Sequence, residues 1–196
     1  MIAKEKLNIL WSLEQTAEKY ADRVAVSDVN QELTWKELVK KAQVIGAELS
    51  EKVQPGNPVP VLLEKSSETL AVMLGIVYAG CFYVPVNPMN PTERLRKIME
   101  KLDPEVSISD EKGKEQLAAV GTGLEDKVMG PEALKTATGT ELSEEQYSRL
   151  EQIQGQWKET DVLYGIFTSG STGTPKAIVV SHGAASRFIR HFTEIF

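Results

Sequence analysis

The sequence predicts an α/β fold, in which a mostly parallel sheet carries helices on both faces. Amphipathic helical segments alternate with short apolar strands, and repeated strand–helix–strand units of this kind form parallel sheets. The stretch Thr69–Val86 contains no charged residue and changes from a helix-like to a strand-like pattern at Gly80. Strands covered on both faces give such continuous apolar runs. We therefore expect a buried helix that leads into a central strand, rather than a membrane span.

Residues 1–110 form the predicted α/β sheet core. Thr34 and Glu37 have the spacing of a capping box, so a helix begins there. Asn90 and Pro91 are typical of another helix start, with Asn90 as N-cap and Pro91 in the first turn. The predicted elements, in order, are a helix over Leu7–Tyr20, a hairpin over Arg23–Asp28 and Gln31–Leu33, a helix from Thr34, a strand over Val59–Leu63, a helix over Ser67–Ala79, a strand over Phe82–Val86, a helix from Asn90 and a strand over Glu105–Ser109.

Two further segments follow. Residues 111–159 are charged, rich in glycine and threonine and poorly periodic, so we expect a charged surface connection with a short helix over Ser143–Gln152. Residues 160–196 contain a strand over Tyr164–Phe167, a Gly/Ser/Thr-rich loop, a β-rich run over Ala177–Val180 and the start of the next helix. We interpret the three segments together as one incomplete domain.

The loop, Thr168–Ala177 (TSGSTGTPKA), carries most of the chemical information. Its glycines can take positive φ and turn backbone N–H groups toward a ligand, and consecutive N–H groups form a concavity that binds an anion. Five hydroxyl groups and one lysine add donors and positive charge, which suits a polyphosphate. The candidate phosphate-binding residues are Thr168, Ser169, Gly170, Ser171, Thr172, Gly173, Thr174 and Lys176.

Two other interpretations of this loop fit less well. A P-loop requires G-x-x-x-x-G-K-[ST]. Counting from Gly165 puts Ser171 at the lysine position, and counting from Gly170 puts Pro175 where the second glycine belongs. The dinucleotide-binding pattern G-x-G-x-x-G is absent as well. A flexible linker would not normally place proline and lysine directly before a β-rich run.

The segment Tyr164–His182 (YGIFTSGSTGTPKAIVVSH) resembles the core signature of the adenylate-forming superfamily. This superfamily includes acyl-CoA synthetases, luciferases and amino-acid adenylation domains. Thr168–Lys176 match the family pattern, whereas Ala177 stands where the family nearly always has glycine. If that position needs a backbone angle open only to glycine, alanine costs roughly 1 kcal/mol or more.

Two upstream segments resemble the same family. Leu33–Leu38 (LTWKEL) is similar to its L-T-[YF]-x-E-L element, and Tyr78–Leu95 is similar to its K-A-G-x-A-Y-[VL]-P-[LI]-D-P-x-x-P-x-E-R-L element, with Asn87 in place of the usual aspartate. The P-x-E-R-L ending is more typical of amino-acid adenylation domains, such as those of nonribosomal peptide synthetases and D-alanine carrier-protein ligases. A short aromatic-rich helix over Phe188–Phe196 favours the D-alanine ligases.

The resemblance implies that the parent protein is an AMP-forming ligase that uses ATP with Mg²⁺. It implies that a small carboxylate substrate, an amino acid, forms an acyl-adenylate with release of pyrophosphate, and that the phosphopantetheine thiol of a carrier protein then takes the acyl group. The family's later motifs do not occur in these 196 residues, so the chain resembles an N-terminal fragment. We expect no catalytic and no metal-binding residue within it, and no activity from it alone.

Two alternatives remain open. The chain could be part of an acyl- or aryl-CoA synthetase, which would lack the aspartate that grips an α-amino group in amino-acid adenylation domains. It could also be a naturally short, non-catalytic binding module. His182 has two interpretations as well: it matches a family histidine, and it could serve as a local helix cap.

Composition excludes several functional classes. A net charge of −6 and a pI near 5.1 argue against nucleic-acid or anionic-membrane partners, which require a basic face. The single cysteine, Cys81, allows no internal disulfide. The N-terminal residues lack the pattern of a signal peptide, so we expect a cytoplasmic protein. We also expect self-association through an apolar face of the last helix, formed by Phe188, Ile189, Phe192 and Ile195.

Overall fold

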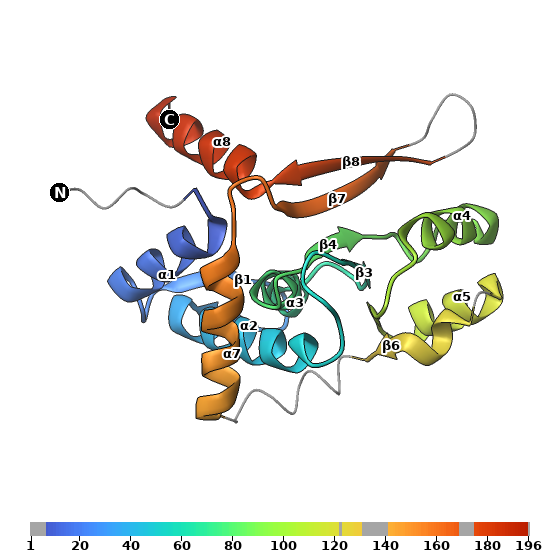
Figure 1. Ribbon diagram of the computed structural model, residues 1–196, viewed down its shortest axis with the longest axis horizontal. Coiled ribbons are helices and arrows are strands. Elements are labelled where there is room, and N and C mark those ends of the chain that lie inside the picture. Colours follow the sequence, from blue (N-terminus) through green and yellow to red (C-terminus); the bar gives the residue numbers. More distant parts are fainter. Residues whose placement is uncertain (1–6, 122, 131–140, 169–174, 196) are drawn as a thin grey trace.

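The fold is a six-stranded sheet with helices on both faces (Figure 1). The structure is a computed structural model that describes residues 7–121, 123–130, 141–168 and 175–195. The strand order is β6-β5-β3-β4-β7-β8, and every neighbouring pair is parallel except β7 and β8. The predicted fold class is therefore confirmed. The strands are β3 (Pro58–Leu62), β4 (Phe82–Pro85), β5 (Ser107–Ser109), β6 (Val128–Met129), β7 (Val162–Thr168) and β8 (Lys176–Ser181).

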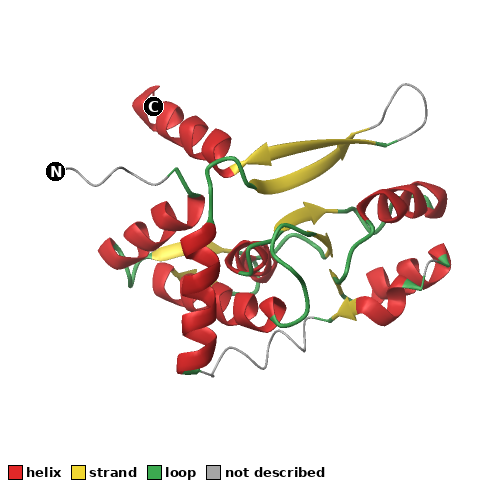
Figure 2. Ribbon diagram, viewed as in Figure 1, coloured by secondary structure: helices red, strands yellow, loops and turns green. Residues whose placement is uncertain are grey.

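Helices cover the sheet in two groups, which Figure 2 shows in red on either side of the strands. Alternate residues of β3 face opposite sides: Val61 packs in a cluster with α2 and α3, and Leu62 packs with α4 and α5. A third cluster joins α1, α2, α3 and α7. The α-helices are α1 (Ile9–Lys19), α2 (Trp35–Ser50), α3 (Ser67–Tyr78), α4 (Thr92–Leu102), α5 (Glu111–Val120), α7 (Glu144–Gln156) and α8 (His182–Ile195). No helix within the described ranges is long and apolar enough to cross a membrane.

The predicted capping box at the start of α2 is confirmed. The Thr34 side chain accepts a hydrogen bond from the Glu37 N–H, and the Glu37 carboxylate accepts one from the Thr34 N–H at 2.8 Å. Before α2, strands β1 (Val24–Ser27) and β2 (Glu32–Thr34) form the predicted antiparallel hairpin. The Thr-x-x-Glu part of the LTWKEL motif thus has a local structural role.

The predicted start of α4 is wrong by one residue. Pro91 is the N-cap, and no side chain accepts a capping hydrogen bond there. Asn90 instead belongs to the turn after β4, where its N–H donates to the Asn87 carbonyl at 3.0 Å. The Asn87 side chain also accepts from the Met89 N–H at 2.9 Å. Asn87 therefore forms an Asx turn. Pro91 takes the N-cap position that was predicted for Asn90.

Residues 111–159, expected as a charged surface connection, contain more regular structure than their weak periodicity indicates. Leu117 of α5 and Met129 of β6 are buried in the core, and β6 extends the sheet as an edge strand. Helix α7 is longer than the predicted Ser143–Gln152 and buries Leu150. A two-residue strand is too short to show alternation, which explains why the sequence pattern did not reveal it.

Candidate phosphate-binding site

The predicted phosphate loop joins two antiparallel strands at the carboxyl end of β7. Strand β7 runs parallel to β4, with Tyr164 beside Tyr83 and their rings stacked at 5.7 Å between centroids. The carboxyl ends of β3, β4, β5 and β7 therefore lie at one edge of the sheet. Ligands of open α/β sheets bind at that edge.

Thr168 and Lys176 flank the loop and face each other as a cross-strand pair. The Thr168 hydroxyl donates a weak hydrogen bond to the Lys176 carbonyl at 3.4 Å. Both residues are exposed, so the lysine ammonium and the threonine hydroxyl are open to a ligand, whereas Pro175 is buried. The other candidate residues, Ser169, Gly170, Ser171, Thr172, Gly173 and Thr174, lie outside the described residues.

Ala177 does not occupy a position that requires glycine. It lies within β8, paired with Phe167, and it is not among the described residues with positive φ. The backbone strain that alanine would suffer at a left-handed position does not arise here. The departure from the family pattern therefore leaves the strand geometry of the hairpin intact.

His182 is buried, and Ser181 rather than His182 caps the start of α8. The Ser181 hydroxyl accepts a hydrogen bond from the Ala184 N–H at 3.2 Å. His182 is 2% exposed, and its imidazole stacks on Trp157 with 5.7 Å between ring centroids. Burial lowers the pKa of His182 to about 4, although the carboxylate of Asp161 opposes this shift. The His182 ring is therefore neutral and supports the start of α8.

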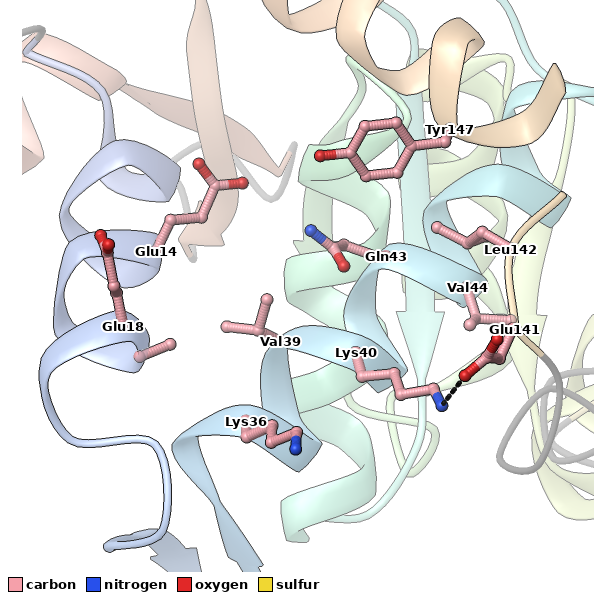
Figure 3. A pocket seen from close by; sticks show the side chains of 11 residues that line it. Glu14, Glu18, Lys36, Val39, Lys40, Gln43, Val44, Glu141, Leu142 and Tyr147 are labelled. Carbon is pink, nitrogen blue, oxygen red and sulfur yellow. Dashed lines mark ion pairs between the residues drawn. The ribbon is translucent and has the colours of Figure 1, made fainter. Parts of the chain in front are cut away.

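The sequence did not point to a groove between α1, α2 and the residues before and within α7 (Figure 3). Its volume is about 570 Å³, and its lining includes Glu14, Gln43 and Tyr147. These residues lie on three segments that are far apart in the chain. Each looks like an ordinary surface position in its own helix, so no sequence signal could have brought them together.

A family model and individual relatives both match most of this chain. The sequence model of the family described as "AMP-binding enzyme" matches residues 13–195. One of the mycosubtilin synthase proteins of Bacillus subtilis is 36% identical over 170 residues, which are 86% of this chain and 6% of that protein. Tyrocidine synthase 1 of Brevibacillus parabrevis is 30% identical over 184 residues, which are 93% of this chain and 16% of that protein. The chain thus spans only a small part of these relatives.

Solved structures share the fold. The crystal structure of VinN has a TM-score of 0.72 and 27% identity, and the match covers 87% of this chain and 44% of that one. A nonribosomal peptide synthetase, FmoA3 in its AMPPNP-bound form, has a TM-score of 0.78 and 24% identity, and the match covers 98% of this chain and 19% of that one. At that identity the second match supports the fold alone.

Proposed function

Because the chain belongs to the AMP-binding enzyme family, we propose that it forms the phosphate-binding part of an amino-acid-adenylating ligase. The observation that carries the proposal is the β7–β8 hairpin. It places Thr168 and Lys176 opposite each other at the carboxyl edge of the sheet, on either side of a Gly/Ser/Thr-rich loop. The similarity to mycosubtilin and tyrocidine synthases supports an amino acid as the substrate.

Lys176 would act by neutralising charge, and the loop hydroxyls would act as hydrogen-bond donors. In the proposed reaction a carboxylate oxygen attacks the α-phosphorus of ATP, the bond to the pyrophosphate oxygen breaks, and an acyl-adenylate forms. Such transfers depend on positioning and electrostatic stabilisation. The Lys176 ammonium would hold the departing pyrophosphate, and the hydroxyl groups would donate hydrogen bonds to its oxygens. Mg²⁺, when bound, would offset part of the phosphate charge. The described residues contain no cluster of His, Cys, Asp or Glu that could hold a metal ion.

The remainder of the proposed site would lie outside these 196 residues. The match to VinN covers 44% of the VinN chain. We propose that adenine, ribose and amino-acid contacts, and the carrier protein that accepts the acyl group on its phosphopantetheine thiol, all involve parts that this chain does not contain. The P-x-E-R-L motif supports an amino-acid adenylation domain, and the aromatic-rich final helix favours the D-alanine ligases within that group. An acyl- or aryl-CoA synthetase is the second candidate.

We also propose that the chain by itself associates with a second copy. Strand β8 is an edge of the described sheet, and helix α8 continues from the end of this strand (Figure 1). Large apolar side chains are exposed on these elements and on β7, namely Ile166, Ile178, Val179, Phe188, Ile189 and Phe192. Ile195, the fourth member of the predicted apolar face, has a side chain outside the described residues. Exposed apolar patches of this kind normally become interfaces.

Hydrogen exchange with pyrophosphate as the probe tests the proposed function. Pyrophosphate is expected to slow amide exchange at both ends of the hairpin, around Thr168 and Lys176, and to leave helix α2 unchanged. Protection spread equally over α2, or no protection at millimolar pyrophosphate, would contradict a phosphate site at this hairpin.

A further inference from the structure

The groove between α1, α2 and the α7 segment combines an apolar floor with fixed polar groups. Val39 and Val44 of α2 and Leu142 supply the apolar surface. Figure 3 shows the Glu14 carboxylate, the Gln43 amide and the Tyr147 hydroxyl facing one another across the open end of the groove. Ligand sites commonly have this composition, in which a few polar groups orient a ligand on apolar surface.

Side chains of two other helices hold the Glu14 carboxylate in place. The hydroxyl of Tyr78, a fully buried residue, donates a hydrogen bond to the Glu14 Oε1 at 3.0 Å, and the Gln154 amide approaches the same oxygen at 3.4 Å. Burial and the neighbouring Glu14 charge raise the pKa of Tyr78, so its hydroxyl remains a donor. Within the part of the chain that the structure describes, no salt bridge neutralises Glu14. The groove therefore presents an oriented, unneutralised carboxylate.

The two walls of the groove carry opposite charges. Glu14 and Glu18 project from α1, one helical turn apart, and Lys36 and Lys40 project from α2 in the same way. Lys40 lies 4.0 Å from Glu141, which is almost fully exposed, and a pair of that kind is weak. A complementary ligand must therefore carry a positive group toward α1, a negative group toward α2 and apolar surface between them.

We propose that this groove binds a peptide segment of a protein partner, which inserts an arginine or lysine side chain toward Glu14. The aliphatic stem of that side chain lies over Val39 and Val44, and the Tyr147 ring and hydroxyl flank its charged end. An acidic residue of the same segment pairs with Lys36 and Lys40. The groove is open to solvent, so it can accept a continuous chain, and its walls of opposite charge match a segment that carries both signs better than a polyanion such as a nucleic acid. This inference does not depend on the proposed phosphate site.

A capped peptide with one arginine between two leucines, followed by one glutamate, is a suitable probe, and titration calorimetry measures its affinity. Glu14→Gln keeps an oxygen that can accept from Tyr78 but removes the charge, and it is expected to weaken binding at least tenfold. Glu115→Gln, a matched change on α5, is expected to leave the affinity within twofold. Lys36→Glu with Lys40→Glu is expected to weaken binding at least fivefold. Thermal unfolding of each variant confirms that it folds.

Three results would overturn the proposal. The first is equal affinity of the wild type and Glu14→Gln, because the carboxylate would then not contact the arginine. The second is equal affinity for a peptide in which norleucine replaces arginine, because binding would then be apolar only. The third is no binding heat at millimolar peptide. A tenfold preference for the arginine peptide that disappears in Glu14→Gln supports the proposal.

Discussion

At His182 a ring nitrogen, Nδ1, is buried without a hydrogen-bond partner among the described residues. The imidazole stacks on Trp157. The His182 backbone is fixed as well, because its N–H donates a hydrogen bond to the Asp161 carbonyl at 3.0 Å. A charged imidazolium in this place would lose hydration without gaining a partner, because the opposing effect of Asp161 is smaller than that of burial. Sequence position alone suggested a cap or a family role for His182, and only the packing identifies it as a neutral core residue.

The buried imidazole predicts a specific pH dependence of stability. The pKa of His182 is about 4 in the folded chain and about 6.5 when unfolded. The unfolded chain therefore binds the proton more tightly, so the His182 contribution is fully present above pH 6.5 and is lost as the pH falls toward 4. The loss is roughly 1–3 kcal/mol. Urea unfolding of the wild type and His182→Leu at pH 7.0, 5.5 and 4.5 measures it. If the free energy of unfolding changed with pH to the same extent in both proteins, this assignment would be contradicted.

At the scale of elements, the contact between α2 and α3 depends on two glycines. A Cβ on Gly75 would lie 2.4 Å from the Ile45 Cγ2 atom, and a Cβ on Gly46 would lie 2.5 Å from the Tyr78 Cβ. Real side chains do not approach this closely, so the two helices could not keep their spacing if either position carried one. Small residues allow such close helix contacts, and the predicted apolar stripes alone do not reveal which glycines serve this purpose.

Gly75→Ala is therefore expected to destabilise the chain by roughly 1–3 kcal/mol, because the added methyl group overpacks the helix contact. Gly155 provides the matched control, since it also lies in a helix but a Cβ added there would meet no atom within 4 Å. Gly155→Ala is expected to stabilise the chain by roughly 0.4–1 kcal/mol through its effect on backbone entropy. Chemical denaturation of both variants is the measurement. Equal effects of the two changes would argue against a close contact at Gly75.

Several elements were predictable because their signals are local. The capping box of Thr34 and Glu37 fixed the start of α2, and the uncharged run after Thr69 predicted α3 and β4. Helix α5 was missed although Asp110 caps its start, because only Leu117 and Val120 mark its buried apolar face and Gly113 takes the third buried position, against Leu62 and Ser109. Strand β6 was missed because it contributes only two residues. A two-residue edge strand such as β6 is specified by tertiary packing rather than by periodicity.

At the scale of the whole molecule, one group of exposed apolar side chains lies on the C-terminal elements β7, β8 and α8. Phe188 is 69% exposed and Phe192 is 51% exposed, and their rings lie 6.1 Å apart on α8. Burial of a large apolar side chain contributes roughly 1.5–3 kcal/mol, so several of them favour association. The sequence pattern predicted this apolar face of α8, but it did not reveal that Ile178 and Val179 of the adjacent edge strand are exposed as well.

We accordingly predict a dimer or larger assembly of this chain at micromolar concentration. Sedimentation equilibrium measures its mass, and Phe188→Glu with Phe192→Glu is expected to shift it toward the monomer by introducing charge into the apolar face. The exposed Glu144→Gln on α7 serves as a control that leaves the mass unchanged. A wild-type chain that is monomeric at all concentrations, and unaffected by the double change, would rule out the proposed interface.

The incomplete coverage of VinN also predicts that this chain alone catalyses no amino-acid-dependent exchange between ATP and pyrophosphate. The reaction needs the carboxylate, the nucleotide and the phosphate groups to be positioned together, and we place only the phosphate contacts in this chain. The exchange of labelled pyrophosphate into ATP, assayed with each of the common amino acids and with D-alanine, is the relevant measurement. Exchange above background with any of them would show that the active site is more complete than we propose.

The position of the candidate phosphate loop between a strand and a β-rich run was predictable from the sequence, and its role in phosphate binding stays a prediction. The hairpin register could not be predicted, because the pairing of Thr168 with Lys176 depends on how β7 and β8 align across the loop. The groove with Glu14 was not predictable at all, since it arises from helices that meet only in the folded chain. Local motifs thus provide a hypothesis about the ligand class, and the fold determines which side chains can share a site.

Titration of pyrophosphate into the wild type, Lys176→Ala and Lys52→Ala by calorimetry tests the central claim most directly. Lys52 is an exposed lysine in the turn after α2, before the start of β3 and so at the opposite edge of the sheet. We predict weak binding by the wild type and by Lys52→Ala, and an affinity at least tenfold lower in Lys176→Ala, a loss of about 1.4 kcal/mol. Equal affinity of Lys176→Ala and Lys52→Ala would contradict the assignment of Lys176 to a phosphate site.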